Sequence, residues 1–354
     1  MNLTRSLASL SVFSVVIFVA VSCSKTEDLP EPARYSLENI EQLELGRVLF
    51  YEKALSINNA VSCGSCHKQV NAFADNTAFS TGFESGKTTR NTPPIQNLNS
   101  GFFEGDEFSG QALFWDGRTR NLNELVIAPT QNHIEMGMRS ADDLVSRLRG
   151  KPYYATLFQN RFGSEEITIE KVSIALTSFI RQFESINSKF DMSFFFNSLD
   201  DLSVLESQGF QLFTGKYNCM SCHDVLSNSG YSEPTGEEFV NIGLNVDYAD
   251  KGRAAVTGNE ADNGKFRIPN LRNIALTAPY MHDGRFSTLE EVIGHYSEDL
   301  QPNINLDSRL RESTGEPLKM NISESETVAL VAFLNTLTDQ NLPHDKRLSD
   351  PFIK

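Results

Sequence analysis

The sequence has too little positive charge for several kinds of partner. Its 31 Lys and Arg residues stand against 46 Asp and Glu residues, which gives a formal net charge of −15. A protein that binds nucleic acid or an anionic membrane surface needs a basic footprint facing the phosphates, and no such excess exists here. The charge argues against both of these partners and favours a neutral or basic one.

Long apolar runs are also scarce, and the one at the N-terminus spans only about fifteen residues, within the usual range of a signal peptide. It lies in MNLTRSLASLSVFSVVIFVAVSC and follows a single arginine. A transmembrane helix needs about 20 apolar residues. The small residues before Cys23 resemble a bacterial lipoprotein cleavage box, in which the cysteine is lipidated, and an ordinary signal with an incidental cysteine is the alternative. We expect a signal peptide at 1–23 and a polar linker at 24–35. The mature protein is expected in the periplasm, with a possible lipid anchor at Cys23.

Strand patterns are weak, because no run alternates between apolar and polar residues for more than a few positions. Helical spacing of apolar residues is clearer, and it recurs within a set of paired segments. The pairs include LGRVLF (45–50) with QGFQLF (208–213) and IALTSFIRQF (174–183) with VALVAFLNTL (328–337). The length suffices for two domains with cores of their own. The sequence therefore predicts a mainly α fold with long connecting loops, in two related modules at 36–195 and 200–345.

Cysteine is rare, and four of the five cysteines share one pattern, Cys-x-x-Cys-His. A disulfide, a zinc half-site and a redox pair are alternatives for Cys-x-x-Cys alone. Zinc would need a second pair at short spacing, and a redox pair would not require histidine at the fifth position. The pattern is typical of c-type haem, whose vinyl groups form thioethers with the cysteines while the histidine binds iron. The predicted haem-binding residues are Cys63, Cys66 and His67, and Cys219, Cys222 and His223.

Further motifs accompany the two haem-binding motifs: RNTP (90–93), FWDGR (114–118), EMG (135–137) and LRNIALTAPYMHDGRFSTLEEV (271–292). Together they resemble the bacterial diheme cytochrome c peroxidase family, which includes the tryptophan-modifying enzyme MauG. The resemblance implies two cytochrome c-like domains, with a peroxidatic haem in the first, electron entry at the haem of the second, and calcium between them. It also implies hydrogen peroxide as substrate, a small cytochrome c or copper protein as electron donor, and a possible homodimer.

The resemblance also assigns roles to single residues. Glu135 matches the acid/base of the peroxide site, and a carboxylate beside a buried haem pocket would have a raised pKa. Trp115 matches the electron relay between the haems. A surface glutamate and a core tryptophan are the structural alternatives. For calcium the resemblance points to Asn91, Thr277 and the carbonyl of Pro279, neutral ligands that suit a hard cation but bind it only modestly without carboxylates.

The sequence departs from the family at the first haem. Members that need reductive activation carry a blocking histidine sixteen residues after the first proximal histidine, and this position is Phe83. The first haem is therefore expected to be five-coordinate and ready. Leu125 replaces a glutamine that many members place near the peroxide and cannot hydrogen-bond to it. His133 could compete as a ligand or proton carrier, although a single loop histidine is more often structural.

A further departure concerns the sixth ligand of the second haem. Typical members have methionine fourteen residues after the histidine of the HDG motif, His282, and this chain has Tyr296. MauG-like members use a tyrosine here, so Tyr296 is the leading ligand, with His295 and Met281 as rivals. On a helix, adjacent residues point about 100° apart, so His295 and Tyr296 cannot both face the iron.

We interpret the sequence as an exported diheme peroxidase that reduces hydrogen peroxide to water. Electrons from an external donor would enter at the C-terminal haem and pass to the N-terminal haem. A MauG-like oxidase acting on a protein substrate and a non-catalytic diheme electron carrier are the alternatives. An open iron position beside Glu135 argues against the carrier.

Overall fold

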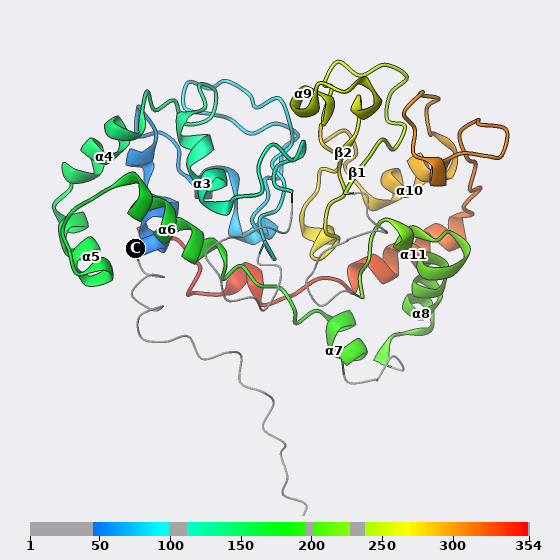
Figure 1. The fold of residues 1–354 in the computed structure, drawn as a ribbon. Helices are drawn as coiled ribbons and strands as arrows, with labels where there is room; N and C mark the ends of the chain where they lie inside the picture. Colours follow the sequence, from blue (N-terminus) through cyan, green and yellow to red (C-terminus); the bar gives the residue numbers. More distant parts are fainter. Residues whose placement is uncertain (1–44, 99–111, 196–200, 227–237, 353–354) are drawn as a thin grey trace, which may run out of the picture. The chain divides into compact units, whose positions relative to one another are not determined.

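The structure, a computed structural model, describes residues 45–98, 112–195, 201–226 and 238–352 (Figure 1). The predicted signal peptide, the linker and Cys23 lie outside the described residues. Contacts join these described residues into one compact unit. In the part that is described, no helix combines the length and apolar character that crossing a membrane would require.

The described chain is mainly helical, as the sequence predicts. Residues 45–51 are helical. The other α-helices are α2 (Cys63–Cys66), α3 (Leu122–Gln131), α4 (Ala141–Arg149), α5 (Pro152–Phe162), α6 (Ile169–Ile180), α7 (Lys189–Phe195), α8 (Val204–Gln211), α9 (Ala254–Thr257), α10 (Leu289–Glu298) and α11 (Glu324–Asn335). Two short strands, β1 (Phe239–Val240) and β2 (Phe266–Arg267), pair antiparallel with Phe239 opposite Arg267.

Hydroxyl side chains fix where the longer helices begin. Each accepts a hydrogen bond from a backbone N–H in the first turn, which has no partner within the helix. The capping residues are Ser140 for α4, Thr168 for α6, Ser203 for α8, Thr288 for α10 and Ser323 for α11. In the last three, a glutamate also accepts from the backbone N–H of the cap residue, which completes a capping box. These short polar signals divide a loop-rich chain into defined helices.

Two hydrophobic cores organise the described residues, one built mainly from residues 45–183 and one from residues 190–337. Each contains a pair of helices that cross closely at a glycine. A Cβ atom at Gly46 would lie 2.1 Å from the carbonyl oxygen of Ala175 in α6, and one at Gly209 would lie 1.9 Å from that of Ala329 in α11. The repeated LG and QG segments therefore have the same packing role, and Figure 1 shows α8 and α11 side by side.

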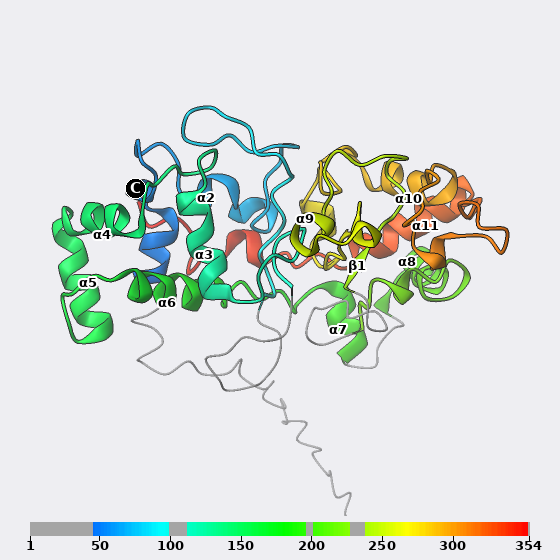
Figure 2. The same ribbon diagram turned by 45° about the horizontal axis from the view of Figure 1, so that its top comes forward.

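The C-terminal segment returns to the first core. Leu342 and Leu348 are buried there, and the Tyr51 hydroxyl donates to the carbonyl oxygen of Leu348 at 2.7 Å. The Gln69 side-chain amide donates to the carbonyl oxygen of Leu342 at 3.0 Å. Figures 1 and 2 show this red segment among the blue and cyan elements of the first core. Chain beyond α11 thus supports the region around the first Cys-x-x-Cys-His motif.

Candidate functional site

The first Cys-x-x-Cys-His motif forms the single-turn helix α2 and ends at His67. Gly64 allows this turn to pack against the ring of Tyr51, since a Cβ atom there would lie 2.5 Å from Tyr51 Cδ1. The Nδ1–H group of His67 donates to the carbonyl oxygen of Phe73, with the two atoms 2.8 Å apart. This bond occupies Nδ1 and leaves Nε2 available to a metal, and burial lowers the pKa of the ring, which favours the neutral form that a ligand needs.

The second motif repeats this arrangement. Cys219 and Cys222 flank a short 3₁₀ turn, and Nδ1 of His223 lies 3.2 Å from the carbonyl oxygen of Pro269. Burial lowers the pKa of His223 to about 4. The four cysteines of the two motifs do not form disulfides. Both histidines are therefore oriented, neutral imidazoles beside two thiols.

A mainly apolar cavity of about 390 Å³ lies beside the second motif. Cys219, Cys222 and His223 line it, as do Tyr296 and Met281. Its volume and apolar walls are typical of a cofactor site. The cavity can hold a flat apolar group attached to the two thiols, with an imidazole on one side.

His295 and Tyr296 are adjacent on α10 and point in different directions, as adjacent positions on a helix require. Tyr296 lines this cavity, and burial raises the pKa of its phenol, with the two thiols of Cys222 and Cys219 adding to the effect. His295 is held elsewhere, because its Nε2 lies 2.8 Å from the carbonyl oxygen of Ile242. Met281 also lines the cavity, from a left-handed backbone position with φ of 73°. Of the three ligands considered, Tyr296 and Met281 are positioned to reach a group in the cavity.

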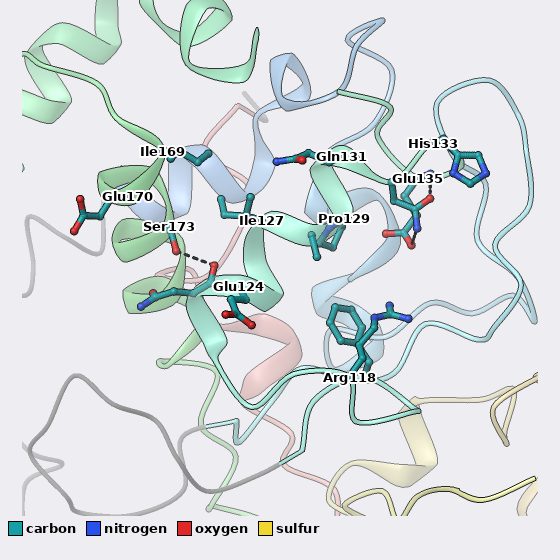
Figure 3. A pocket seen from close by; sticks show the side chains of 14 residues that line it. Arg118, Glu124, Ile127, Pro129, Gln131, His133, Glu135, Ile169, Glu170 and Ser173 are labelled. Carbon is teal, nitrogen blue, oxygen red and sulfur yellow. Dashed lines mark hydrogen bonds between the residues drawn. The ribbon is translucent and has the colours of Figure 1, made fainter. Parts of the chain in front are cut away.

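Glu135 lines a second, more open cavity of about 690 Å³ between the start of the FWDGR segment and helices α3 and α6. Figure 3 shows the carboxylate on the same side of this cavity as Arg118, with the His133 ring pointing away from both. The Asn132 amide donates to Oε1 of Glu135 at 2.8 Å. Burial raises the pKa of Glu135 above its ordinary value, and the nearby Arg118 charge partly offsets the increase.

Glu135 also lies within electrostatic reach of the first motif. Its charge contributes to the raised pKa values of the Cys63 and Cys66 thiols, both of which are raised mainly by burial. The three residues predicted for the first site are thus brought into one region together with Glu135. The cavity itself is lined by Glu135 and not by the two cysteines or His67.

Phe83 stands at the sequence position of the missing blocking histidine, and its side chain is packed. The ring of Phe83 lies against Gly137, where a Cβ atom would approach Phe83 Cε1 to 2.5 Å, and Gly137 adopts φ of 70°. The Phe83 N–H donates to the carbonyl oxygen of Glu135 at 3.0 Å. Leu125 packs against the first core. Phe83 therefore shapes the turn that carries Glu135 and offers no metal ligand.

Trp115 and its neighbour Phe114 line different cavities. Phe114 lines the cavity beside Glu135, while Trp115 lines the cavity beside the second motif. The indole N–H of Trp115 donates to the carbonyl oxygen of Asn91 at 2.8 Å, and its own carbonyl oxygen accepts from the backbone N–H of Arg267. One dipeptide thus connects the two regions, and both ends of Trp115 are fixed.

Sequence reasoning did not identify an ionic cluster that holds this dipeptide. Arg90 binds Asp250 through two hydrogen bonds, of 2.7 and 2.8 Å, and Asp116 through a third of 2.6 Å. Asp116 directly follows Trp115 and also pairs with Arg118 at 3.1 Å. The RNTP and FWDGR motifs contain these charges, but nothing in their spacing indicates that Asp250 completes the cluster.

The residues suggested for calcium line one cavity. Asn91, Thr277 and Pro279 all line the cavity beside the second motif, and the Asn91 N–H donates to the carbonyl oxygen of His282 at 2.7 Å. The side-chain amide of Asn91 donates to the carbonyl oxygens of Thr77 and Ala78. Within the described ranges, no three His, Cys, Asp or Glu side chains gather as a metal site. The arrangement offers neutral oxygen ligands only.

Two further histidines, His282 and His344, are not among the predicted ligands. His282 lines the cavity beside the second motif, where its ring stacks on Phe266 with centroids 3.7 Å apart. Burial lowers its pKa to about 4. His344 is exposed in the short turn after α11. Both observations agree with a structural role.

Comparison with known proteins identifies the family. Residues 40–196 match the model of the di-haem cytochrome c peroxidase family. The cytochrome c551 peroxidase of Nitrosomonas europaea is 32% identical over 343 residues, which cover 95% of this chain and 91% of the relative. This chain belongs to the di-haem cytochrome c peroxidase and MauG-like family. Membership makes it a haem-containing oxidoreductase of the peroxidase or oxidase type.

Other di-haem relatives represent both branches of the family. The methylamine utilization protein MauG of Methylorubrum extorquens is 35% identical and covers 88% of this chain and 82% of the relative. The crystal structure of a MauG-like protein associated with microbial copper homeostasis matches with a TM-score of 0.77 and 32% identity, over 93% of this chain and 100% of that one. The diheme peroxidase BthA from Burkholderia thailandensis shares the fold, with a TM-score of 0.69 over 87% of each chain at 23% identity.

The family implies two haem c groups, and the residues fit them. Each motif supplies two thiols and a neutral, oriented imidazole. The second set opens into an apolar cavity of suitable size, and the first lies in a buried region rich in aromatic side chains. The residues that would hold the haems are the two cysteines and the histidine of each motif.

Proposed function

We propose that the chain is a di-haem peroxidase that reduces hydrogen peroxide at the His67 site without prior activation, in two cytochrome c-like domains at 36–195 and 200–345. One observation carries the proposal: Glu135, with a raised pKa, lines an open cavity near the first motif. Phe83, at the sequence position of the blocking histidine, packs against Gly137 and offers no ligand. A carrier without catalysis has no use for either feature. Both features suit an iron position that peroxide can reach.

When bound, the haem at His67 would supply an open iron position for peroxide, and the haem at His223 would accept electrons from the donor. Glu135 would take the proton from one peroxide oxygen and return it to the other, which leaves as water, and two electrons from the donor with two protons from solvent would convert the remaining oxygen to a second water. The task requires a carboxyl group that can take a proton from peroxide and give it back, so its most effective pKa lies near the operating pH, above that of an ordinary carboxyl group. Burial moves the pKa of Glu135 in the required direction. The amide of Asn132 holds the carboxylate in position.

Trp115 carries electrons between the two sites in this proposal. Its indole lines the cavity of the second site, and its neighbour Phe114 lines the cavity beside Glu135. The bond from the indole N–H to Asn91 and the ionic cluster around Asp116 keep the ring in one orientation. A fixed aromatic ring between two redox sites avoids the reorganisation that a mobile one would require.

A MauG-like oxidase is the second function, because Tyr296 lines the second cavity. A phenolate ligand would stabilise the ferric and higher oxidation states of that iron relative to methionine. The second site could then hold an oxidising equivalent and pass it to a protein substrate. Met281 remains the rival ligand from the same cavity wall.

We also propose calcium bound by Asn91, Thr277 and the carbonyl of Pro279, with water as further ligands. Their position along the wall next to Trp115 supports a role in holding the region between the two sites. A site of neutral oxygens binds calcium weakly compared with carboxylate-rich sites. Removal of the ion is therefore expected to need only a mild chelator.

The setting that fits this function is the periplasm, with Cys23 as a possible lipid anchor. Haem attachment through Cys-x-x-Cys-His and the apolar N-terminal run both support export. The electron donor would be a small cytochrome c or copper protein, and the net charge of −15 favours a donor with a basic docking face. A homodimer is a further expectation from the family.

Steady-state kinetics on the fully oxidised protein test the proposal. Hydrogen peroxide and a reduced small cytochrome c are mixed with the protein, and oxidation of the donor is followed by absorbance. We expect turnover without a lag. A lag that disappears after prior reduction would contradict the ready first site, and an absence of peroxide-dependent oxidation would contradict peroxidase function with this class of donor.

A further inference from the structure

Two adjacent tyrosines at the start of α5 share one buried carboxylate, at a place that none of the roles above uses. The rings of Tyr153 and Tyr154 lie 4.7 Å apart between centroids. The Tyr154 hydroxyl donates to Oε2 of Glu52 at 3.1 Å, and the Tyr153 hydroxyl donates to the same atom. Glu52 is only 5% exposed, whereas Tyr153 is 39% exposed. We call Tyr153 and Tyr154 the tyrosine pair.

The shared carboxylate gives the tyrosine pair a proton acceptor that Tyr51 and Tyr280 lack. Oxidation of a phenol to a neutral radical releases one proton, and a carboxylate can accept it. The hydroxyl groups of Tyr51 and Tyr280 donate instead to peptide carbonyl oxygens, which are very weak bases. Burial and the Glu52 carboxylate raise the pKa of both members of the pair, so each phenol keeps its proton until it is oxidised.

The pair is connected to the first haem-binding motif through consecutive residues. Tyr51 directly precedes Glu52 in the chain, and its ring packs against Gly64 within the Cys-x-x-Cys turn. Tyr51 also lies near Cys63, whose charge contributes to raising its pKa. Tyr51 and Glu52 are adjacent in the chain, so one residue contacts the Cys-x-x-Cys turn while the next binds Tyr153 and Tyr154.

We propose that Tyr153 is a redox-active surface residue from which the oxidised His67 site withdraws electrons. The step balances as follows: one electron passes from the phenol to haem iron oxidised by peroxide, the phenolic proton passes to Glu52, and a neutral tyrosyl radical remains at Tyr153. An electron from an exposed tyrosine or tryptophan of a protein substrate and the proton held by Glu52 then restore the phenol, and the oxidised substrate residue releases its own proton to solvent. The inference rests on the proposed function, which supplies the oxidant.

A purely structural role of Glu52 and the tyrosine pair predicts a different result for substitution of Tyr153. Glu52 also accepts from the backbone N–H of Ala54 at 2.8 Å, so its bonds join that turn to α5. If this were its whole purpose, removing the Tyr153 hydroxyl would change stability alone, and Tyr154 would keep the carboxylate in place. A redox role predicts loss of a radical with the fold intact.

Radical and cross-link formation in the loaded protein provide the test. Oxidised holoprotein receives hydrogen peroxide without a donor, and three readouts follow: the haem spectrum, the tyrosyl signal in electron paramagnetic resonance, and dityrosine-linked dimers on a denaturing gel. In the wild type, radicals on two copies couple into dityrosine. We expect the dimer to be lost in Tyr153→Phe.

Tyr217→Phe is the matched control, because the Tyr217 hydroxyl also donates to a carboxylate, Glu326 Oε2 at 2.8 Å, while its ring is only 8% exposed. We expect this variant to form the dimer as the wild type does. Equal dimer formation in Tyr153→Phe, or a wild type whose haem spectrum changes without any tyrosyl signal, would overturn the inference alone. A haem spectrum unchanged by peroxide would overturn the proposed function, and the inference with it.

Discussion

Replacing Glu135 with glutamine removes the proton acceptor of the peroxide site and changes little else. The glutamine side chain keeps the size of glutamate and can still accept from the Asn132 amide, which lies 2.8 Å from Oε1. It cannot take up a proton from peroxide. Positioned acid–base groups contribute about 10²- to 10⁴-fold to rate. We therefore expect kcat/KM for peroxide to fall by that range, about 2.7–5.4 kcal/mol of transition-state stabilisation at 1.36 kcal/mol per tenfold.

The pH dependence of wild-type activity tests the same role of Glu135. Glu135 acts first as a base, so activity falls as pH decreases through its pKa. Burial raises that pKa above the ordinary 4.5, so the acid limb of kcat/KM should lie above pH 4.5. Arg118 opposes the shift, and Arg118→Gln should therefore move the acid limb to higher pH. Glu135→Gln should abolish this limb.

Glu170→Gln is a suitable control, because Glu170 lines the same cavity from α6 and is exposed. It is not among the groups that shift the pKa of Glu135. The assay is donor oxidation at limiting peroxide across the pH range, with both haems verified by absorbance. A Glu135→Gln enzyme within a few-fold of wild type, or an acid limb that moves to lower pH in Arg118→Gln, would refute the reasoning.

Three further substitutions address the other roles. Trp115→Phe removes the indole and its bond to the Asn91 carbonyl. Stopped-flow absorbance should show slower electron transfer between the haems, with both haem spectra unchanged. An unaltered rate of transfer would exclude the relay. Tyr296→Phe should change the spectrum of the His223 haem alone, whereas an unchanged spectrum would favour Met281 as ligand. Phe83→His should introduce a lag in peroxide turnover that prior reduction abolishes, although loss of the Phe83 packing on Gly137 adds a stability cost; unchanged kinetics would mean that the new imidazole does not reach the iron.

Residue spacing was sufficient to predict the mainly helical class, two of the helices and the cysteine motifs. Helical periodicity at 174–183 and 328–337 corresponds to α6 and α11, because each helix buries an apolar stripe against its core. The close crossings at Gly46 and Gly209 follow from the repeated segments. The return of Leu348 to Tyr51 could not be predicted, since it joins positions 297 residues apart with no matching pattern.

The candidate site was predictable only in part, for a similar reason. Periodicity showed that either His295 or Tyr296 could face the second haem. The choice depends on how α10 is rotated about its axis. The hydrogen bond from His295 to the Ile242 carbonyl shows this rotation, and Ile242 lies 53 residues away in the chain. The anchoring of His67 by the Phe73 carbonyl depends on a loop in which Phe73 itself has φ of 60°. Such tertiary contacts have no signature in local sequence.

The electron paramagnetic resonance spectrum of the fully oxidised protein, before and after one molar equivalent of hydrogen peroxide, tests the central claim most directly. The account predicts a high-spin ferric signal from the His67 haem beside a low-spin signal from the His223 haem, with the high-spin signal lost on peroxide addition. Two low-spin signals that do not respond to peroxide would contradict it, because both irons would then be capped in the resting protein.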